Sequence, residues 1–218
     1  MAKSVYSLVL SDAVIEAIDR EAYRSGVSRS QMIDRVLAEY VGLVTPERRI
    51  RRVFGQIEDM LTGTGSFQLT MQPTASTMSL RSALNYKYNP TIRYSIERRT
   101  TGLNEEIWLK IQLRTSNQTL INYMHYFFRY WQELEERKGT RWNMAPARYE
   151  RKLKLPEIED RELYFGEQIA DYIRSIDESL NLYFKEITTT NIMDEVVPRS
   201  ALKAVLQHYA QTAGKLDL

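Results

Sequence analysis

The N-terminal part of the chain changes its hydrophobic period, and each period predicts a different kind of element. Residues 5–10 alternate between two faces, which is the pattern of a half-buried β-strand. One face holds Tyr6, Leu8 and Leu10, and the other holds Val5, Ser7 and Val9.

The stretch that follows predicts two short helices. Ser11-Asp12 precedes an apolar run of helical spacing, and such a residue caps a helix because its side-chain oxygen accepts an orphan backbone N–H. The first helix is expected to end at Ser25-Gly26, and the second to run from Ser28 to Gly42. Their apolar faces comprise Val14, Ile15, Ile18 and Ala22 in the first helix and Met32, Ile33, Val36, Leu37, Tyr40 and Val41 in the second.

The predicted strand has no partner within this segment. Its backbone N–H and C=O groups would lack hydrogen-bond partners, and its apolar face would be exposed to solvent. The two helices are too short to cover every apolar residue. A second copy of the chain solves this most simply, by forming a two-stranded antiparallel ribbon with the helices of both chains behind it. We therefore predict that residues 1–44 form a dimerisation module.

The order of strand, cap, turn and second helix resembles the ribbon-helix-helix superfamily of DNA-binding proteins, of the Arc, MetJ and CopG type. The features that carry the resemblance are the strand SLVL (7–10), the cap Ser11-Asp12, the turn SGVSRS (25–30) and the helix cores Ile15-Ile18-Ala22, Met32-Ile33 and Val36-Leu37.

The resemblance implies that the ribbon of the dimer enters the major groove of double-stranded DNA. The side chains that would face the bases are Lys3, Val5, Ser7 and Val9. The start of the second helix would hold a phosphate by its open N–H groups and its positive dipole end. The residues concerned are Ser28, Arg29 and Ser30, and Arg29 adds a charge.

The outward face of the predicted strand departs from the pattern of that family, which usually places polar or charged residues there. Val5 and Val9 flank Ser7, and valine neither donates nor accepts a hydrogen bond. Two interpretations follow. The valines strengthen the ribbon, or they contact thymine methyl groups while binding relies on phosphates and groove shape.

A third helix is predicted from Thr45-Pro46 to Gly63, on an apolar stripe at Ile50, Val53, Phe54, Ile57 and Leu61. Opposite the stripe lie Arg48, Arg49, Arg51 and Arg52. These arginines either contact phosphates beside the first module, which would increase the salt dependence of binding, or form a solvated helix face. Gly63–Ser66 is the predicted joint, so residues 45–64 are expected to be a connecting helix and linker.

Residues 65–218 are predicted to form an α+β domain. Its first half alternates with period two between turn-forming residues, which predicts an antiparallel meander of about four strands with one covered face. The alternating positions are Phe67, Leu69 and Met71; Met78 and Leu80; Leu84, Tyr86 and Tyr88; Ile92, Tyr94 and Ile96; and Ile107, Leu109, Ile111 and Leu113.

Helical periods dominate the second half of the predicted domain. A helix over residues 117–138 is expected to cover the sheet, and a loop with the basic run 148–154 follows through Pro156. A long helix over 160–187 carries an apolar seam for another helix, supplied by the sister chain or by the same chain. A last helix begins after Pro198. The overall expectation is an α+β fold, with a ribbon-helix-helix dimerisation module followed by an antiparallel sheet packed with long helices.

Composition narrows the function classes. The chain of 218 residues is 43% hydrophobic and 27% charged, as in an ordinary globular protein, and its net charge of +2 permits nucleic-acid binding without arguing for it. It has no cysteine, which excludes disulfides, thiolate catalysis and cysteine-based zinc sites. No apolar run could span a membrane or form a signal peptide, so we expect a cytoplasmic, nucleoid-associated protein.

Residues with catalytic potential are few. Neither His125 nor His208 has a second ligand at metal spacing, and the sequence contains no GxGxxG, GxxxxGK or GxSxG motif. We therefore expect no enzyme activity, no cofactor and no metal. The acidic pairs Glu105-Glu106 and Glu157-Glu159 stand in turn or charged contexts, which indicates solvated side chains.

Tyrosine is unusually frequent, with 14 in the chain. Those near Lys87, Arg93, Arg98 and Arg99 could stack nucleobases, or the phenols could orient a small ligand in a pocket. The interpretation we favour is that they fill sheet and helix faces at wet edges.

The sequence as a whole predicts a dimeric DNA-binding protein, most simply a transcriptional repressor on a pseudo-palindromic site. Plasmid or chromosome partition and nucleoid organisation are the alternatives on DNA. The second domain would sense a small molecule, bind a protein or build higher oligomers. A different class of function is an interaction protein that uses the first module only to dimerise. Val5 and Val9 favour it, whereas Arg29 and the cluster from Arg48 to Arg52 oppose it.

Overall fold

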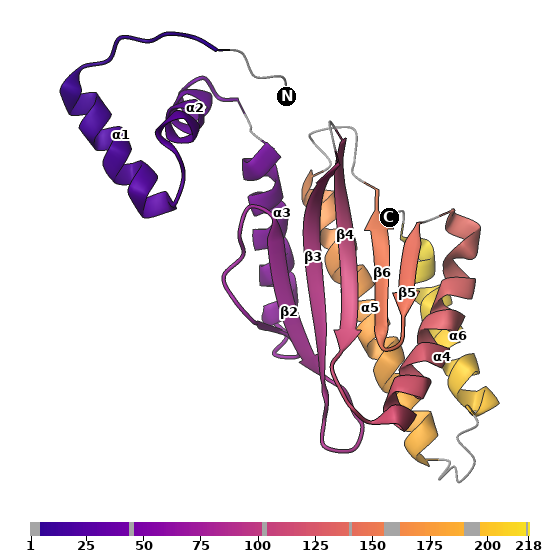
Figure 1. The fold of residues 1–218 in the computed structure, drawn as a ribbon. Helices are drawn as coiled ribbons and strands as arrows, with labels where there is room; N and C mark the ends of the chain where they lie inside the picture. Colours follow the sequence, from indigo (N-terminus) through magenta and orange to yellow (C-terminus); the bar gives the residue numbers. More distant parts are fainter. Residues whose placement is uncertain are drawn as a thin grey trace. The chain divides into compact units, whose positions relative to one another are not determined.

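The fold was examined in a computed structural model that describes residues 5–43, 46–101, 104–139, 141–154, 162–189, 197–216 and 218. The chain divides into two compact units, Met1–Arg49 and Ile50–Leu218. Figure 1 shows that the first unit is helical and that the second combines a sheet with helices. The prediction of an α+β fold is therefore confirmed, and each unit is described by itself.

The first unit contains the two predicted helices, α1 (Asp12–Ser25) and α2 (Arg29–Tyr40). Gly26 ends α1 in the left-handed region at φ 62°, a conformation that glycine adopts without a Cβ clash. Ser28 caps α2 through a capping box with Gln31, in which each residue bonds the other's backbone N–H. Ser11 occupies the N-cap position of α1 but its side chain makes no capping bond, so that part of the prediction is corrected.

The segment before α1 is irregular. Residues 5–10 form no strand and pair with no strand of the described residues, and every strand of the sheet comes from residues 68–153. A ribbon made by two chains cannot form in a single chain, so the ribbon stays a prediction.

The second unit is built on a six-stranded antiparallel sheet in the order β1-β2-β3-β4-β6-β5. Its strands are β1 (Gln68–Leu69), β2 (Thr77–Ala83), β3 (Thr91–Thr101), β4 (Asn104–Leu113), β5 (Trp142–Ala145) and β6 (Arg148–Leu153). The first four form the predicted meander, which is confirmed.

Two segments of the sheet region differ from their predictions. The alternation over Tyr86 and Tyr88 predicts a strand, but the chain turns there, with Tyr88 and Asn89 at positive φ. The basic run 148–154 predicts a loop, but residues 148–153 form β6, which pairs with β4. A charged residue at an inward position hides the alternation of β6, because Arg151 lies between Tyr149 and Leu153 on the buried face.

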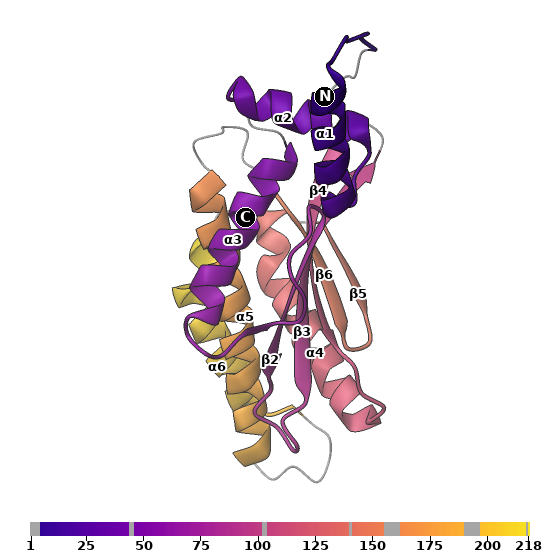
Figure 2. The same cartoon turned by 90° about the vertical axis from the view of Figure 1, so that its left-hand side faces the viewer.

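The helices of the second unit lie on one side of the sheet (Figures 1 and 2). They are α3 (Pro46–Thr62), α4 (Gln118–Glu135), α5 (Glu162–Thr189) and α6 (Arg199–Gln211), with short 3-10 turns η1 (Glu136–Lys138) and η3 (Ala213–Lys215). The seam of α5 is buried inside this chain, since Ile169, Ile173 and Leu180 are fully covered by neighbouring elements of the same core. The same chain, not a sister chain, therefore covers the seam.

Helix α3 belongs to the core of the second unit from Ile50 onward. Its stripe is buried to 5% exposure or less, at Ile50, Val53, Phe54, Ile57 and Leu61. The prediction of a connecting helix with a joint at Gly63–Ser66 is thus corrected, because the boundary between the units falls before Ile50. The expected start at Thr45 lies outside the described residues. None of the described helices is long and apolar enough to cross a membrane.

Candidate functional site

The first unit leaves most of its apolar side chains uncovered. In its described part the buried apolar residues are Ala22, Met32 and Ala38 alone. By contrast, the following large apolar side chains are more than a third exposed: Val5, Tyr6, Leu8, Val9, Leu10, Val14, Tyr23, Val36, Leu37, Tyr40, Val41 and Leu43. The core of this unit is therefore small, and exposed apolar surface of this extent is a common feature of interaction sites.

The residues predicted to face DNA bases are solvent-accessible where they are described. Val5 and Val9 are about 100% exposed, and Ser7 is exposed between them. Lys3 lies outside the described residues. The sequence therefore identifies a segment that is accessible in the described part of the chain.

The start of α2 brings together the residues predicted to hold a phosphate, and two of them already have partners. The hydroxyl of Ser28 accepts the Gln31 N–H at 3.3 Å within the capping box. Arg29 makes a bidentate ion pair with Asp19 of α1, at 2.7 Å from Nε to Oδ1 and 2.6 Å from Nη2 to Oδ2. Ser30 is exposed. A phosphate at this helix end would have to compete with Asp19 for Arg29.

The ion pair also shifts the pKa values of both Asp19 and Arg29. The hydrogen bond from Arg29 lowers the pKa of the Asp19 carboxyl, and the bond to Asp19 raises the pKa of Arg29. Both groups are therefore charged over the whole neutral range. Sequence spacing gives no sign of this contact, because the two residues belong to different helices and meet only through the turn at Gly26.

The four arginines of α3 lie on both sides of the boundary between the two units. Arg48 lies 3.4 Å from Glu39 of α2 within the first unit, and Arg49 is half-buried. Arg51 and Arg52 belong to the second unit and are exposed. The prediction that the four residues contact phosphates stays a prediction.

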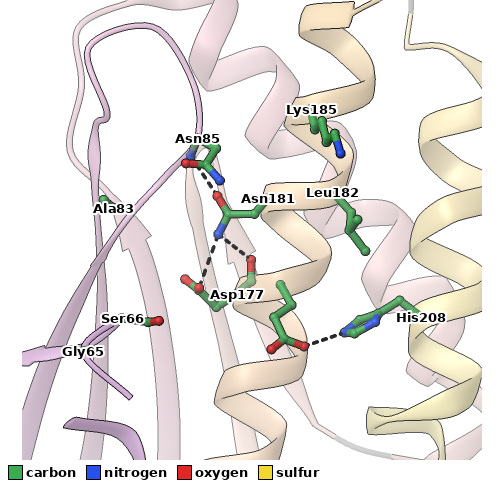
Figure 3. Close-up of a pocket in the computed structure, with 10 residues that line it drawn as sticks. Gly65, Ser66, Ala83, Asn85, Asp177, Asn181, Leu182, Lys185 and His208 are labelled. Carbon is green, nitrogen blue, oxygen red and sulfur yellow. Dashed lines mark hydrogen bonds and ion pairs between the residues drawn. The ribbon is translucent and has the colours of Figure 1, made fainter. Parts of the chain in front are cut away.

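A groove of about 660 Å³ opens in the second unit between the end of β2, helix α5 and helix α6 (Figure 3). Its lining residues are Gly65, Ser66, Ala83, Asn85, Asp177, Glu178, Asn181, Leu182, Lys185 and His208. None of them was predicted as a site residue. The one sequence signal is Asp177, which stands at an inward position of α5 among apolar residues.

Asp177 is the anchor between α5 and the sheet. Its Oδ1 accepts hydrogen bonds from the Ser82 hydroxyl and from the Tyr94 hydroxyl at 2.7 Å, and its Oδ2 accepts one from Asn181 at 3.3 Å. Burial raises the pKa of the Asp177 carboxyl above its ordinary value, although the Ser82 and Tyr94 hydrogen bonds act to lower it. These hydrogen bonds join α5 to strands β2 and β3, so the Asp177 carboxyl has a structural role.

The remaining polar groups of the groove are held in pairs or exposed. His208 Nε2 lies 3.1 Å from Glu178 Oε2, and the Asn85 backbone N–H donates to Asn181 Oδ1 at 2.8 Å. Lys185 is exposed. Among the described residues no serine, threonine or tyrosine hydroxyl bonds the His208 imidazole, and the Thr212 hydroxyl donates to the His208 backbone carbonyl at 2.7 Å. The described lining therefore shows no hydroxyl paired with a base as in nucleophilic catalysis.

The structure places Tyr94 on the inner face of the sheet, where it fills the core, and so does not support the alternative in which it stacks a nucleobase beside Arg93. Tyr94 points into the core and donates to Asp177, while its neighbours Arg93 and Ser95 face the other side of the sheet. The aromatic residue on that other side is Trp108, which is 9% exposed and has Arg99 over its ring at 5.0 Å. A base could not stack on a ring that an arginine already covers.

No group of three or more His, Cys, Asp or Glu side chains in the described parts of the chain is placed to hold a metal ion. Comparison with protein-family models, with curated proteins and with solved structures gave no match for this chain.

Proposed function

We propose that this chain is a homodimeric DNA-binding protein that acts as a transcriptional regulator, most simply a repressor, at the nucleoid. The uncovered apolar surface of the first unit carries this proposal. Residues 5–10 alternate as a strand but have no partner, and Val36 and Leu37 of α2 are about half exposed. A second copy supplies both a partner strand and a cover for the helices.

The DNA-binding part of the proposal is supported by the start of α2 and by the strand residues. The capping box fixes a helix end whose first N–H groups face solvent at Arg29 and Ser30, and the segment that would form the ribbon is accessible. Two-stranded ribbons fit the major groove of B-DNA. Regulation, partition and nucleoid organisation share this mode of binding.

A second candidate function is a protein-interaction module in which the first unit serves only to dimerise. Val5 and Val9 favour it, because a fully exposed valine offers no hydrogen bond to a base edge. The pairing of Arg29 with Asp19 favours it as well, since that guanidinium is neutralised in the single chain.

Titration of the full chain with random duplex DNA at several salt concentrations tests the proposal. We expect log affinity to fall steeply and linearly with log salt, because bound phosphates release counterions. Replacing Lys3, Ser7 and Arg29 together by alanine should weaken binding and lower the slope by about 2 per chain for the two lost charges. Sedimentation should still show a dimer.

Arg24→Ala is the matched control, because Arg24 is an exposed arginine of the same unit that is paired with Glu21. It should leave the slope close to that of the wild type. A triple variant with unchanged affinity would move the assignment to the interaction module.

A further inference from the structure

The face of the sheet that points away from the helices carries a row of cations. Alternate residues of a strand point to opposite faces, and cross-strand register fixes which of them are neighbours. Gln68 lies opposite Arg81, Arg81 opposite Arg93, Arg93 opposite Gln112, and Gln112 opposite Arg148. We call these five residues the cationic row. It contains three arginines and two glutamines and no carboxylate.

The arginines of the row are not balanced within it. Arg81 donates to the neutral Gln68 side chain, at 2.9 Å from Nη2 and 3.2 Å from Nε. Arg93 is exposed and makes no side-chain hydrogen bond or ion pair with another described residue. Like charges directly opposite each other on neighbouring strands are unfavourable, so Arg81 beside Arg93 costs stability.

One further cation and one carboxylate border the row. Lys110 follows in the next register position of β4 and likewise has no polar partner among the described residues. Glu150, opposite Lys110, approaches Arg148 only to 3.7 Å and is shared with Arg99 at 3.4 Å. The positive charge at this end of the sheet therefore exceeds the negative charge.

The other end of the same face is electrically balanced. Arg99 pairs with Glu97 at 2.7 Å, and Lys152 pairs with Glu106 at 2.5 Å. The charged residues of the face are thus separated into a neutral network and a cationic row. If this face served only to keep the sheet soluble, any polar side chain would suffice, and the unfavourable placement of Arg93 opposite Arg81 would have no purpose.

We propose that the cationic row binds the phosphate backbone of double-stranded DNA, as a contact separate from that of the first unit. The inference rests on the proposed function, because the duplex is the polyanion which that function brings to the protein. Guanidinium groups recognise phosphate by two parallel hydrogen bonds, and the glutamine amides add neutral donors. Every member of the row is polar, which disfavours an apolar protein partner.

The dimensions of the row fit this ligand. Neighbouring strands are about 4.8 Å apart, so Arg81 and Arg148 are separated by three spacings, roughly 14 Å. Duplex DNA carries a charge about every 1.7 Å of its axis, so that length presents about eight phosphates to three arginines. Binding of this kind reads no base and adds affinity that is independent of sequence.

The test compares three variants of the full chain on random duplex DNA, with the log–log salt slope of affinity as the readout. The row variant is Arg81→Gln, Arg93→Gln and Arg148→Gln combined. The control variant removes the same charge from exposed helical positions through Arg129→Gln, Arg199→Gln and Lys203→Gln. The first-unit variant replaces Lys3, Ser7 and Arg29 by alanine.

We expect the row variant to lower the slope by up to about 2.7 per chain, as three lost phosphate contacts predict, and the control variant to leave it near the wild-type value. Replacing the same three arginines by lysine should restore most of the slope, which separates charge from folding. A row variant that behaves like the control variant overturns the inference.

The outcomes also separate this inference from the proposed function. If the first-unit variant loses binding and the row variant keeps the wild-type slope, the proposed function stands and the cationic row does not bind DNA. If the row variant alone loses slope, the row binds DNA and the first unit does not. If neither variant changes the slope, both proposals are wrong.

Discussion

Arg151 of β6 and Glu135 of α4 form a fully buried ion pair, with the arginine Nε 3.1 Å from the glutamate Oε2. The Tyr149 hydroxyl donates to the same Oε2 at 2.7 Å. Arg151 Nη2 donates to the Leu218 carbonyl at 2.9 Å, and its guanidinium lies 4.6 Å from the centre of the Tyr172 ring. The pair thus joins the sheet, α4, α5 and the C-terminal segment.

Breaking this pair should destabilise the second unit strongly. Arg151→Ala leaves the Glu135 carboxylate buried without its counter-charge, which costs about 3–5 kcal/mol in free energy of unfolding. Urea denaturation followed by tryptophan fluorescence measures the change, because Trp131 lies beside Tyr172 in the same core. Arg24→Ala, which breaks the exposed pair with Glu21, should cost less than about 1 kcal/mol. Equal losses of unfolding free energy in the two variants would show that burial of the ion pair does not determine its contribution to stability.

Asp177 should make stability depend on pH with the sign opposite to that of an ordinary ion-paired carboxyl. Its pKa is raised in the folded protein, so the folded state binds the proton more tightly than the unfolded state does. The stabilisation is fully present below the unfolded pKa and is lost as pH rises through the folded pKa.

Asp177→Asn removes that titration. The unfolding free energy of the wild type should therefore fall relative to that of the variant as pH rises above about 4, which is the ordinary aspartate pKa. Chemical denaturation at a series of pH values measures it. A difference that stays constant with pH would mean that Asp177 does not titrate anomalously.

The capping box of α2 gives a local prediction with a built-in control. Ser28→Ala removes a side chain that accepts the Gln31 N–H, and loss of such a cap costs about 1 kcal/mol. Amide hydrogen exchange in α2 should then be about five-fold less protected. Ser11→Ala should change protection in α1 little, because the Ser11 side chain makes no capping bond. Similar losses in both helices would contradict this assignment of the caps.

The pair of Arg29 with Asp19 should limit DNA binding under the proposed function. Asp19→Asn removes the negative charge that Arg29 contacts at 2.6 Å, and thereby leaves the guanidinium available to a phosphate. We expect the affinity for duplex DNA to rise at low salt, whereas Arg29→Ala lowers it. If Asp19→Asn changes affinity equally in the presence and absence of Arg29, the pair has no part in binding.

Dimer formation should depend on the exposed apolar residues of the first unit. Leu8→Ser combined with Leu37→Ser removes apolar area from the predicted ribbon and from α2, and should shift the protein from dimer to monomer in sedimentation experiments. Leu206→Ser is the control, since Leu206 is a similarly exposed leucine of α6 in the second unit. A double variant that remains dimeric would place the dimer interface elsewhere.

Local signals in the sequence determined the helices and the meander. Ser28, Gln31 and Gly26 fix the ends of α1 and α2, because capping and left-handed turns involve residues within a few positions of each other. Period-two alternation likewise located β2, β3 and β4, since each strand buries one regular face. For the same reason helical periodicity alone reveals the apolar seam of α5, whichever element covers it.

Contacts between distant segments were decided only by the tertiary structure. The sequence shows Arg151 as part of a basic run and Arg29 as a free cation, but folding pairs each with a carboxylate on another element. The opposition of Arg81 and Arg93 depends on strand register, which no single strand encodes. Periodicity reports which face of an element is buried, whereas the choice of neighbour across that face is made when the whole chain packs.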